Sequence, residues 1–125
     1  MSESGKARPS VLVVDDEAPL LEIIQKQLQD EFRVETASSA EEADLHLGSA
    51  SFDLVLADHM MPGEAGLDFL MRVREHFPET KRILMTGYLN PELISRAQSL
   101  AGLSAYLIKP VSAEQLLAAV RGALS

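Results

Sequence analysis

Four apolar runs in the sequence each lead into a polar residue with definite chemistry. Asp15 and Asp16 follow the first of these runs, and Asp58, Thr86 and Lys109 end or follow the other three. Short, β-branched apolar runs are typical of strands buried on both faces of a parallel sheet. The carboxyl ends of parallel strands lie at one edge, where α/β folds bind ligands. We therefore expect these five side chains to converge on one site.

The charges expected at this edge favour a hard divalent cation. Three carboxylates placed close together repel one another, and some would stay protonated unless a cation lies among them. Oxygen ligands, few in number and held on a rigid edge, suit Mg²⁺, which keeps several of its waters. A phosphoryl group on Asp58 would then lie between the metal, the ammonium of Lys109 and the hydroxyl of Thr86. Phosphoryl transfer requires this positioning and charge stabilisation, and a carboxylate is a known type of covalent acceptor.

Each of these residues alone has a simpler interpretation. Asp15 and Asp16 could cap the helix that follows them, and Asp58 could end its strand or cap a turn. Thr86 alone is an ordinary residue for a strand end, and Lys109 alone is more often a solvated surface charge. The site hypothesis depends on their joint placement at strand ends.

The three histidines do not form a second metal site. His46 and His76 lie on expected helices remote from His59, and we interpret all three as surface residues.

The rest of the chain predicts the elements that would position the site. Five apolar runs alternate with five segments of helical periodicity, which indicates right-handed βαβ units and helices on both faces of a parallel sheet. Asn90-Pro91-Glu92 is a strong helix start, and Gly48 is expected to end the second helix. The strands are expected at 11–14, 32–36, 54–57, 82–86 and 104–108, and the helices begin near 18, 38, 67, 90 and 112.

The composition restricts the class of function. A chain of 125 residues has the usual size of one domain, expected here over 10–125, with residues 1–9 as a flexible tail. It has no cysteine, which excludes disulfides, thiolate zinc sites and a thiol nucleophile. A net charge of −8 disfavours direct binding of nucleic acid and favours cations and basic protein surfaces. No apolar run approaches the length of a membrane span, and a cytoplasmic location is expected.

In combination, these motifs resemble the response-regulator receiver domain of two-component signalling. The resemblance covers about Ser10 to the C-terminus. It implies an α/β, flavodoxin-like (βα)5 fold: a doubly wound, five-stranded parallel sheet with strand order 2-1-3-4-5. The matching motifs are Val13-Val14-Asp15-Asp16-Glu17, Asp58-His59-Met60-Met61-Pro62 with Gly66, Thr86-Gly87 and Tyr106-Leu107-Ile108-Lys109-Pro110.

The resemblance also implies chemical roles. Asp58 would accept a phosphoryl group from a phosphohistidine on a sensor histidine kinase or a histidine phosphotransfer protein. Asp16 and Asp58 would ligate Mg²⁺ directly, Asp15 mainly through water, and the backbone carbonyl of Met60 would complete the protein's ligands. Lys109 would pair with Asp58 and then with the phosphoryl group. Such a domain is a regulatory phosphoacceptor rather than an enzyme: it catalyses only its own phosphoryl transfer and dephosphorylation.

Two further residues would make the domain a switch. Thr86 would move toward the phosphoryl group, and Tyr106 would follow it inward. The Lys109-Pro110 peptide bond would be cis. The surface of the fourth helix, fifth strand and fifth helix would change, and it would control a partner protein, an attached output domain or a homodimer.

Four residues qualify the resemblance. Leu103 replaces a small residue that is usual in the family, and Val111 replaces a common aromatic. Met60 and Tyr88 occupy the positions that in this family tune hydrolysis of the acyl phosphate. An apolar Met60 cannot orient an attacking water, so we expect a phosphoryl state that is not especially short-lived.

Two other functions are compatible with this fold. One is an interaction module that has lost phosphorylation, against which the intact acidic residues argue. The other is a cofactor carrier such as a flavin protein, which would need a phosphate-binding loop after the first strand. Asp15-Asp16-Glu17 stands there instead and would repel a phosphate.

Overall fold

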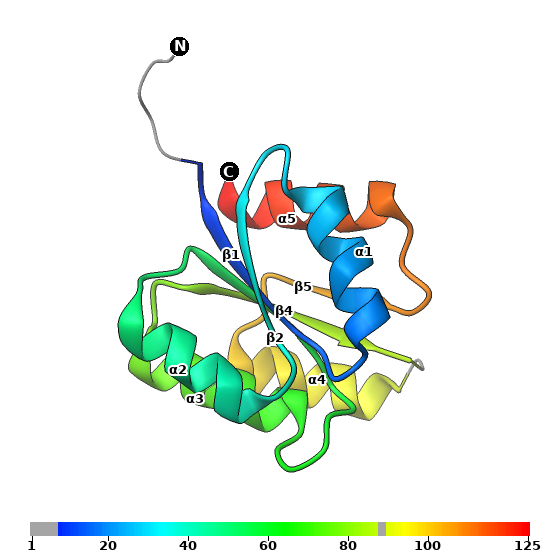
Figure 1. Cartoon of the computed structure of the whole chain (residues 1–125). Coiled ribbons are helices and arrows are strands. Elements are labelled where there is room, and N and C mark those ends of the chain that lie inside the picture. The colour runs from blue at the N-terminus through cyan, green and yellow to red at the C-terminus, as the bar shows by residue number, and fades with distance from the viewer. Residues whose placement is uncertain (1–7, 88–89) are drawn as a thin grey trace.

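The computed structural model describes residues 8–87 and 90–125, in which five strands alternate with five helices (Figure 1). The strands are β1 (Ser10–Val14), β2 (Arg33–Ala37), β3 (Leu54–Asp58), β4 (Lys81–Thr86) and β5 (Ala105–Ile108). The helices are α1 (Ala18–Leu28), α2 (Ala40–Ser49), α3 (Gly66–His76), α4 (Pro91–Ala101) and α5 (Ala113–Leu124).

The five strands form one parallel sheet in the order β2-β1-β3-β4-β5, which confirms the predicted topology. The register brings the carboxyl ends of the inner strands to one edge. Val14 pairs with Ala57, and Asp58 pairs with Met85. Thr86, at the end of β4, pairs with Ile108. The residues that end or follow β1, β3, β4 and β5 therefore lie close together.

Helices cover both faces of the sheet. In Figure 1, α1 and α5 lie on one face, and α2, α3 and α4 lie on the other. Alternate residues of β1 point to the two layers: Val11 and Val13 pack with α1 and α5, and Leu12 and Val14 pack with the other three helices. All four side chains are fully buried, and burial of each such side chain stabilises the fold by roughly 1.5–3 kcal/mol.

The ends of the helices follow local capping chemistry, with one exception to the sequence prediction. Asn90 caps α4 by accepting hydrogen bonds from the backbone N–H groups of Glu92 and Leu93. The prediction that Gly48 ends α2 was wrong, because the helix continues to Ser49. A glycine ends a helix when it adopts a left-handed conformation. Among the described glycines, only Gly63 and Gly102 have a positive φ.

Gly66 allows α3 to begin directly against the end of β3. A Cβ atom at this position would lie 2.2 Å from the carbonyl oxygen of Asp58 and 2.8 Å from the Cα of His59. Both obstacles belong to the backbone, which cannot rotate away as a side chain would. The position therefore requires glycine because of close packing beside Asp58, and not because of a positive φ.

We expect Gly66→Ala to lower the free energy of unfolding by about 3 kcal/mol, because α3 must move away from β3. Gly48→Ala is the matched control, since nothing lies within 4 Å of its Cβ position and the site is helical. It should stabilise the protein by about 0.5–1 kcal/mol. Urea denaturation followed by circular dichroism measures both changes. Equal effects of the two substitutions would contradict the packing argument.

Candidate functional site

The carboxyl ends of β1, β3, β4 and β5 bring together Asp15, Asp58, Thr86 and Lys109. The side chains of Asp15 and Thr86 are fully buried, and Asp58 is 2% exposed. The Nζ atom of Lys109 lies 3.1 Å from Oδ2 of Asp15 and 3.2 Å from Oδ1 of Asp58. The backbone N–H of Lys109 donates to the carbonyl of Thr86 at 2.7 Å, which fixes the β5 end beside β4.

The surroundings of Asp58 and Lys109 shift the pKa values of both groups. Burial raises the pKa of Asp58 above its ordinary value, and the charge of Asp15 raises it further. Lys109 and the backbone N–H of Met60, which donates to the Asp58 carboxylate, oppose this rise without cancelling it. Burial alone would lower the pKa of Lys109, but its bonds and attraction to Asp15 and Asp58 raise it overall. One charged ammonium is thus shared between two carboxylates.

The acidic residues after β1 form an open cluster that fits a hard cation. The carboxylate oxygens offered by Asp15, Asp16 and Glu17 all lie within 4.8 Å of one another. Asp15 is buried and oriented by a hydrogen bond from the backbone N–H of Glu17 to its Oδ1 at 2.9 Å, whereas Asp16 and Glu17 are exposed. Asp58 adjoins this cluster through Lys109. Excess negative charge and an all-oxygen donor set are what Mg²⁺ requires.

The sequence interpretation did not include Glu17 among the ligand candidates. The run of three consecutive acidic residues, Asp15-Asp16-Glu17, could have indicated Glu17 as a ligand, but we used that run only as a family motif. In the structure Glu17 is also the residue that precedes α1, so the turn into the helix places its carboxylate near those of Asp15 and Asp16.

The histidines were interpreted as surface residues, which is right only for His76. His59 is half-buried: its backbone N–H donates to the carbonyl of Met85 at 2.8 Å, and its Nδ1 accepts from the backbone N–H of Leu67 at 3.4 Å. It therefore links the end of β3 to β4 and to the first turn of α3. His46 is half-buried and contacts Phe52 edge to face.

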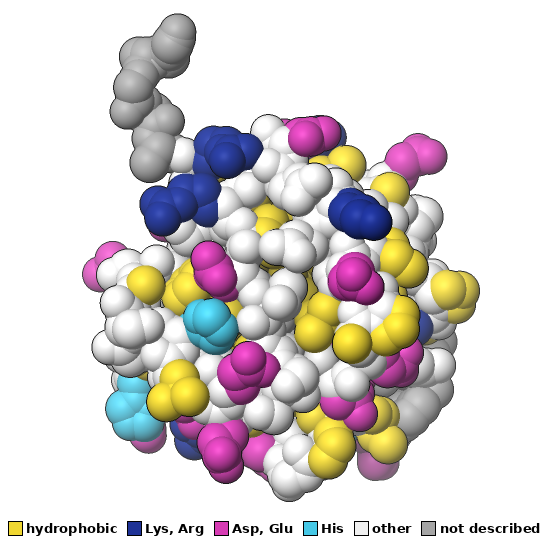
Figure 2. All heavy atoms as spheres, in the orientation of Figure 1, with side chains coloured by type: hydrophobic (Ala, Val, Ile, Leu, Met, Phe, Trp, Pro, Cys, Tyr) yellow, Lys and Arg dark blue, Asp and Glu magenta, His cyan; other side chains and the backbone are white. Residues whose placement is uncertain are grey.

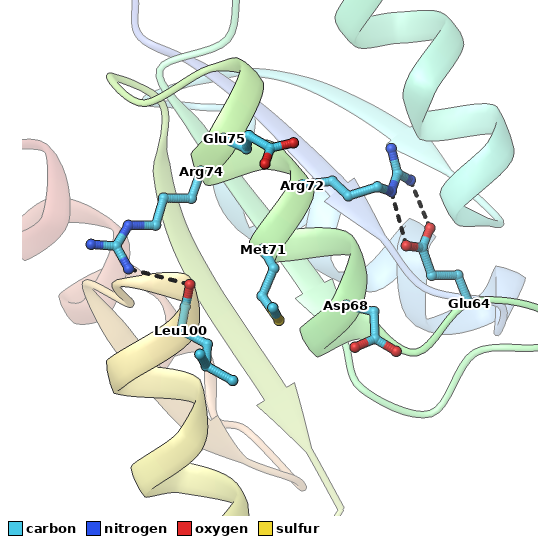
Figure 3. Close-up of a pocket in the computed structure, with 7 residues that line it drawn as sticks. All are labelled: Glu64, Asp68, Met71, Arg72, Arg74, Glu75 and Leu100. Carbon is cyan, nitrogen blue, oxygen red and sulfur yellow. Dashed lines mark hydrogen bonds and ion pairs between the residues drawn. The ribbon is translucent and has the colours of Figure 1, made fainter.

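An arginine braces the loop that follows Asp58. Arg72 on α3 donates two hydrogen bonds to Glu64, at 2.9 and 2.6 Å (Figure 3). It donates two more to Asp44 on α2, at 3.2 and 3.1 Å. Its guanidinium also lies over the ring of Phe69. The Glu64 bonds raise the pKa of Arg72, and Arg72 lowers that of Glu64. The loop carrying Met60 is thus tied to two helices.

The expected switch residues occupy different environments. The side chain of Thr86 is fully buried at the site, whereas that of Tyr106 on β5 is 40% exposed. The Lys109-Pro110 peptide bond is cis. Met60 is 59% exposed beside the site, and Tyr88 lies outside the described residues.

An apolar groove borders the site on the side of α1. It has a volume of about 450 Å³ and reaches Lys109 at the carboxyl edge of the sheet. Hydrophobic side chains also gather beside α1 on the face shown in Figure 2, among scattered acidic residues. The apolar lining residues are Leu20, Ile23, Ile24, Met85, Pro110, Val111 and Leu116.

Residues 11–121 match the family model described as the response regulator receiver domain. The chain belongs to this family of two-component signalling domains. The fold predicted from the sequence is therefore that of a receiver domain. Within the described part of this receiver domain, no helix is long and apolar enough to cross a membrane.

Similar proteins include regulators and single receiver domains. The chain is 41% identical over 115 residues to the hydrogenase transcriptional regulatory protein HoxA of Cupriavidus necator, covering 92% of this chain but 24% of that protein. It is 35% identical to the phosphate regulon transcriptional regulatory protein PhoB of Rhizobium meliloti, covering 93% of this chain and 52% of PhoB. The receiver domain therefore spans about a quarter to a half of these relatives.

Solved structures resemble it over nearly the whole chain. The signal receiver domain of an HD domain-containing protein from Pseudomonas fluorescens Pf-5 has a TM-score of 0.89 and 34% identity, with 94% of each chain covered. The chemotaxis response regulator CheY4 of Vibrio cholerae has a TM-score of 0.84 and 30% identity, covering 92% of this chain and 98% of CheY4.

We expect Asp58→Asn to stabilise the metal-free protein, because it removes a buried charge. The folded-state pKa of Asp58 is raised above 3.8, so its contribution to stability falls as the pH rises from about 4 through that pKa. The variant should be more stable than the wild type at about pH 7, and the gain should vanish near pH 4. Urea denaturation at both pH values measures this difference.

The exposed Asp30→Asn serves as control for the loss of one negative charge. A less stable Asp58→Asn protein at neutral pH would show that Lys109 fully compensates the buried carboxylate.

Proposed function

We propose that this receiver domain is a Mg²⁺-dependent phosphoacceptor switch and that Asp58 carries the phosphoryl group. One observation supports this above the others: Asp58 lies buried beside Asp15 at the sheet edge, and both carboxylates share the ammonium of Lys109. Burial disfavours the negative charge of the Asp58 carboxylate. A covalent bond to an electrophile would remove that charge from the carboxylate oxygen, and a nearby cation would offset it. An acid that served only as a helix cap would not need this burial.

In the proposed reaction, a carboxylate oxygen of Asp58 attacks the phosphorus of a phosphohistidine. The oxygen–phosphorus bond forms as the phosphorus–nitrogen bond breaks, and its electron pair remains on the imidazole nitrogen, which takes up a proton. Lys109, whose Nζ lies 3.2 Å from Oδ1 of Asp58, would contact the phosphoryl oxygens. Asp15, Asp16, Asp58 and the carbonyl of Met60 would hold Mg²⁺, which offsets charge on the transferred group.

The switch would operate through Thr86 and Tyr106. A phosphoryl group adds negative charge next to the buried Thr86, whose hydroxyl would turn toward it. Tyr106, now exposed, would move inward into the vacated space and alter the surface of α4, β5 and α5. That surface would control an output domain, a separate effector or a homodimer in the cytoplasm. HoxA and PhoB, by their names, act as transcriptional regulators.

The chemistry is tested by intact mass after incubation with acetyl phosphate, with and without Mg²⁺. We expect the wild type to gain one phosphoryl group only with Mg²⁺, and Asp58→Asn to gain none. The gain should persist for longer than seconds after the donor is removed, because Met60 cannot orient a water. No gain in a folded protein would overturn the proposal and favour an interaction module.

We further propose that the groove beside α1 receives the phosphohistidine-bearing protein. It is apolar and adjoins Lys109, so a protein bound there would present its histidine close to Asp58. A small donor such as acetyl phosphate would not need the groove. Ile23, 51% exposed, is the most accessible of its large apolar side chains.

We expect Ile23→Lys to slow phosphoryl transfer from a histidine kinase at least about tenfold, since burying a lysine in an apolar contact is costly. Phosphorylation by acetyl phosphate should be unchanged. Leu45→Lys, at a 74% exposed position on α2, is the matched control. The assay uses any sensor kinase that phosphorylates the wild type. An equal loss with both donors would contradict a role in partner binding.

A further inference from the structure

The C-terminal end of α4 is held by two arginines from other elements. An α-helix leaves the last four carbonyls without an intrahelical partner. Arg74 on α3 donates from Nη1 to two of them, at 3.1 and 3.2 Å, and Figure 3 shows one of these bonds. Arg82 on β4 donates to the next two, at 2.6 and 3.2 Å. The four carbonyls belong to Ser99, Leu100, Ala101 and Gly102.

The contact with Arg82 is buried and has no carboxylate in it. Arg82 is 8% exposed, and its other hydrogen bonds go to the carbonyls of Thr80 at 2.6 Å and Pro78 at 3.4 Å. Among the described residues, no carboxylate forms an ion pair with it. Burial and the charge of Arg74 lower its pKa. Arg82 is therefore directed entirely at backbone carbonyls.

The C-terminal end of α4 has no basic residue of its own to offset its partial negative charge. The C-terminal end of a helix carries partial negative charge, which basic side chains in the last turn usually offset. α4 has no basic residue in its last turn, whereas α1, α3 and α5 each have at least one. Arg74 and Arg82 supply this charge from α3 and β4. They join the end of α4 to two other elements of the fold.

Gly102 makes the close approach of both arginines possible. It ends α4 in the left-handed conformation, with φ of 59°. A Cβ atom there would lie 3.3 Å from the guanidinium of Arg74 and 3.4 Å from that of Arg82. A larger residue would be strained in its backbone and would crowd both side chains.

The two ends of α4 are held differently. The described cap at the N-terminal end is local, because Asn90 binds the N–H groups of Glu92 and Leu93 within the same turn. The C-terminal end is held by tertiary hydrogen bonds. Arg82 also belongs to the same buried strand as Thr86, the residue at the phosphoacceptor edge.

We propose that Arg74 and Arg82 form a fixed arginine anchor for the last turn of α4, so that phosphorylation changes the N-terminal part of the helix relative to that anchor. The second half of this proposal rests on the proposed phosphoacceptor function. The anchor itself is a property of the unmodified protein. The surface of α4 that responds to Asp58 would then be the part nearest Asn90.

The anchor is tested first in the unmodified protein by hydrogen–deuterium exchange with mass spectrometry. We expect Arg82→Met to accelerate amide exchange over residues 98–104 at least about tenfold, because buried carbonyls lose charged donors. Arg74→Met should have the same effect in smaller degree. Arg96→Met removes an exposed arginine of the same helix and should leave that exchange unchanged. Equal exchange in Arg82→Met and Arg96→Met would overturn the anchor.

Arg82→Lys provides a variant that keeps the charge but not the planar set of donors. If Arg82→Met does not fold, Arg74→Met and Arg82→Lys make the same comparison with Arg96→Met. Both should accelerate exchange over 98–104 more than over 91–95.

The movement is tested by the same exchange measurement after acetyl phosphate and Mg²⁺, with phosphoryl uptake checked by intact mass in each sample. We expect exchange in the wild type to change over 91–95 and not over 98–104. In Arg82→Met the change should extend to 98–104. An equal change at both ends of wild-type α4 would overturn the proposal that only the N-terminal part of the helix changes relative to the arginine anchor. Absence of uptake would instead contradict the phosphoacceptor function, while the unmodified samples would still decide the anchor.

Discussion

The site depends on one ammonium group shared by two buried carboxylates. Lys109 lies within 3.2 Å of both Asp15 and Asp58, whose side chains the sheet almost completely shields from water. Neither carboxylate can relieve the repulsion by moving into solvent, because both follow or end strands buried on both faces of the sheet. Burial and repulsion together raise the pKa of Asp58, so the folded protein maintains a charge that its surroundings disfavour. A bound cation, or an electrophile bonded to Asp58, would reduce the repulsion between the two carboxylates.

The surrounding structure prevents this cluster from relaxing. Gly66 lets α3 pack against the backbone of Asp58, and Arg72 ties the following loop to α2 and α3. At the amino end of β4, away from the site, Arg82 holds the end of α4 to the strand that ends in Thr86. The contacts of Gly66 and Arg72 fix the position of the backbone beside Asp58. They leave the exposed Asp16 and Tyr106 able to respond to a ligand.

Much of the fold and of the site could be predicted because both depend on local patterns. Apolar runs and helical periodicity gave the sheet, and the strand ends alone implied that Asp58 and Lys109 meet. The contacts that sequence reasoning missed connect distant residues, such as Arg82 with the end of α4. The exposure of a histidine also depends on neighbours from other elements, which no local pattern specifies.

The most direct test of the shared-charge site is Mg²⁺ binding by the unmodified protein, measured by calorimetric titration at about pH 7. We expect the wild type to bind one Mg²⁺ saturably, and Asp16→Asn and Asp58→Asn each to weaken this binding at least about tenfold, as loss of a ligand should. Asp30→Asn, remote from the site, should bind as the wild type does. No saturable binding, or equal binding by all four proteins, would contradict the assignment of the acidic cluster as a cation site.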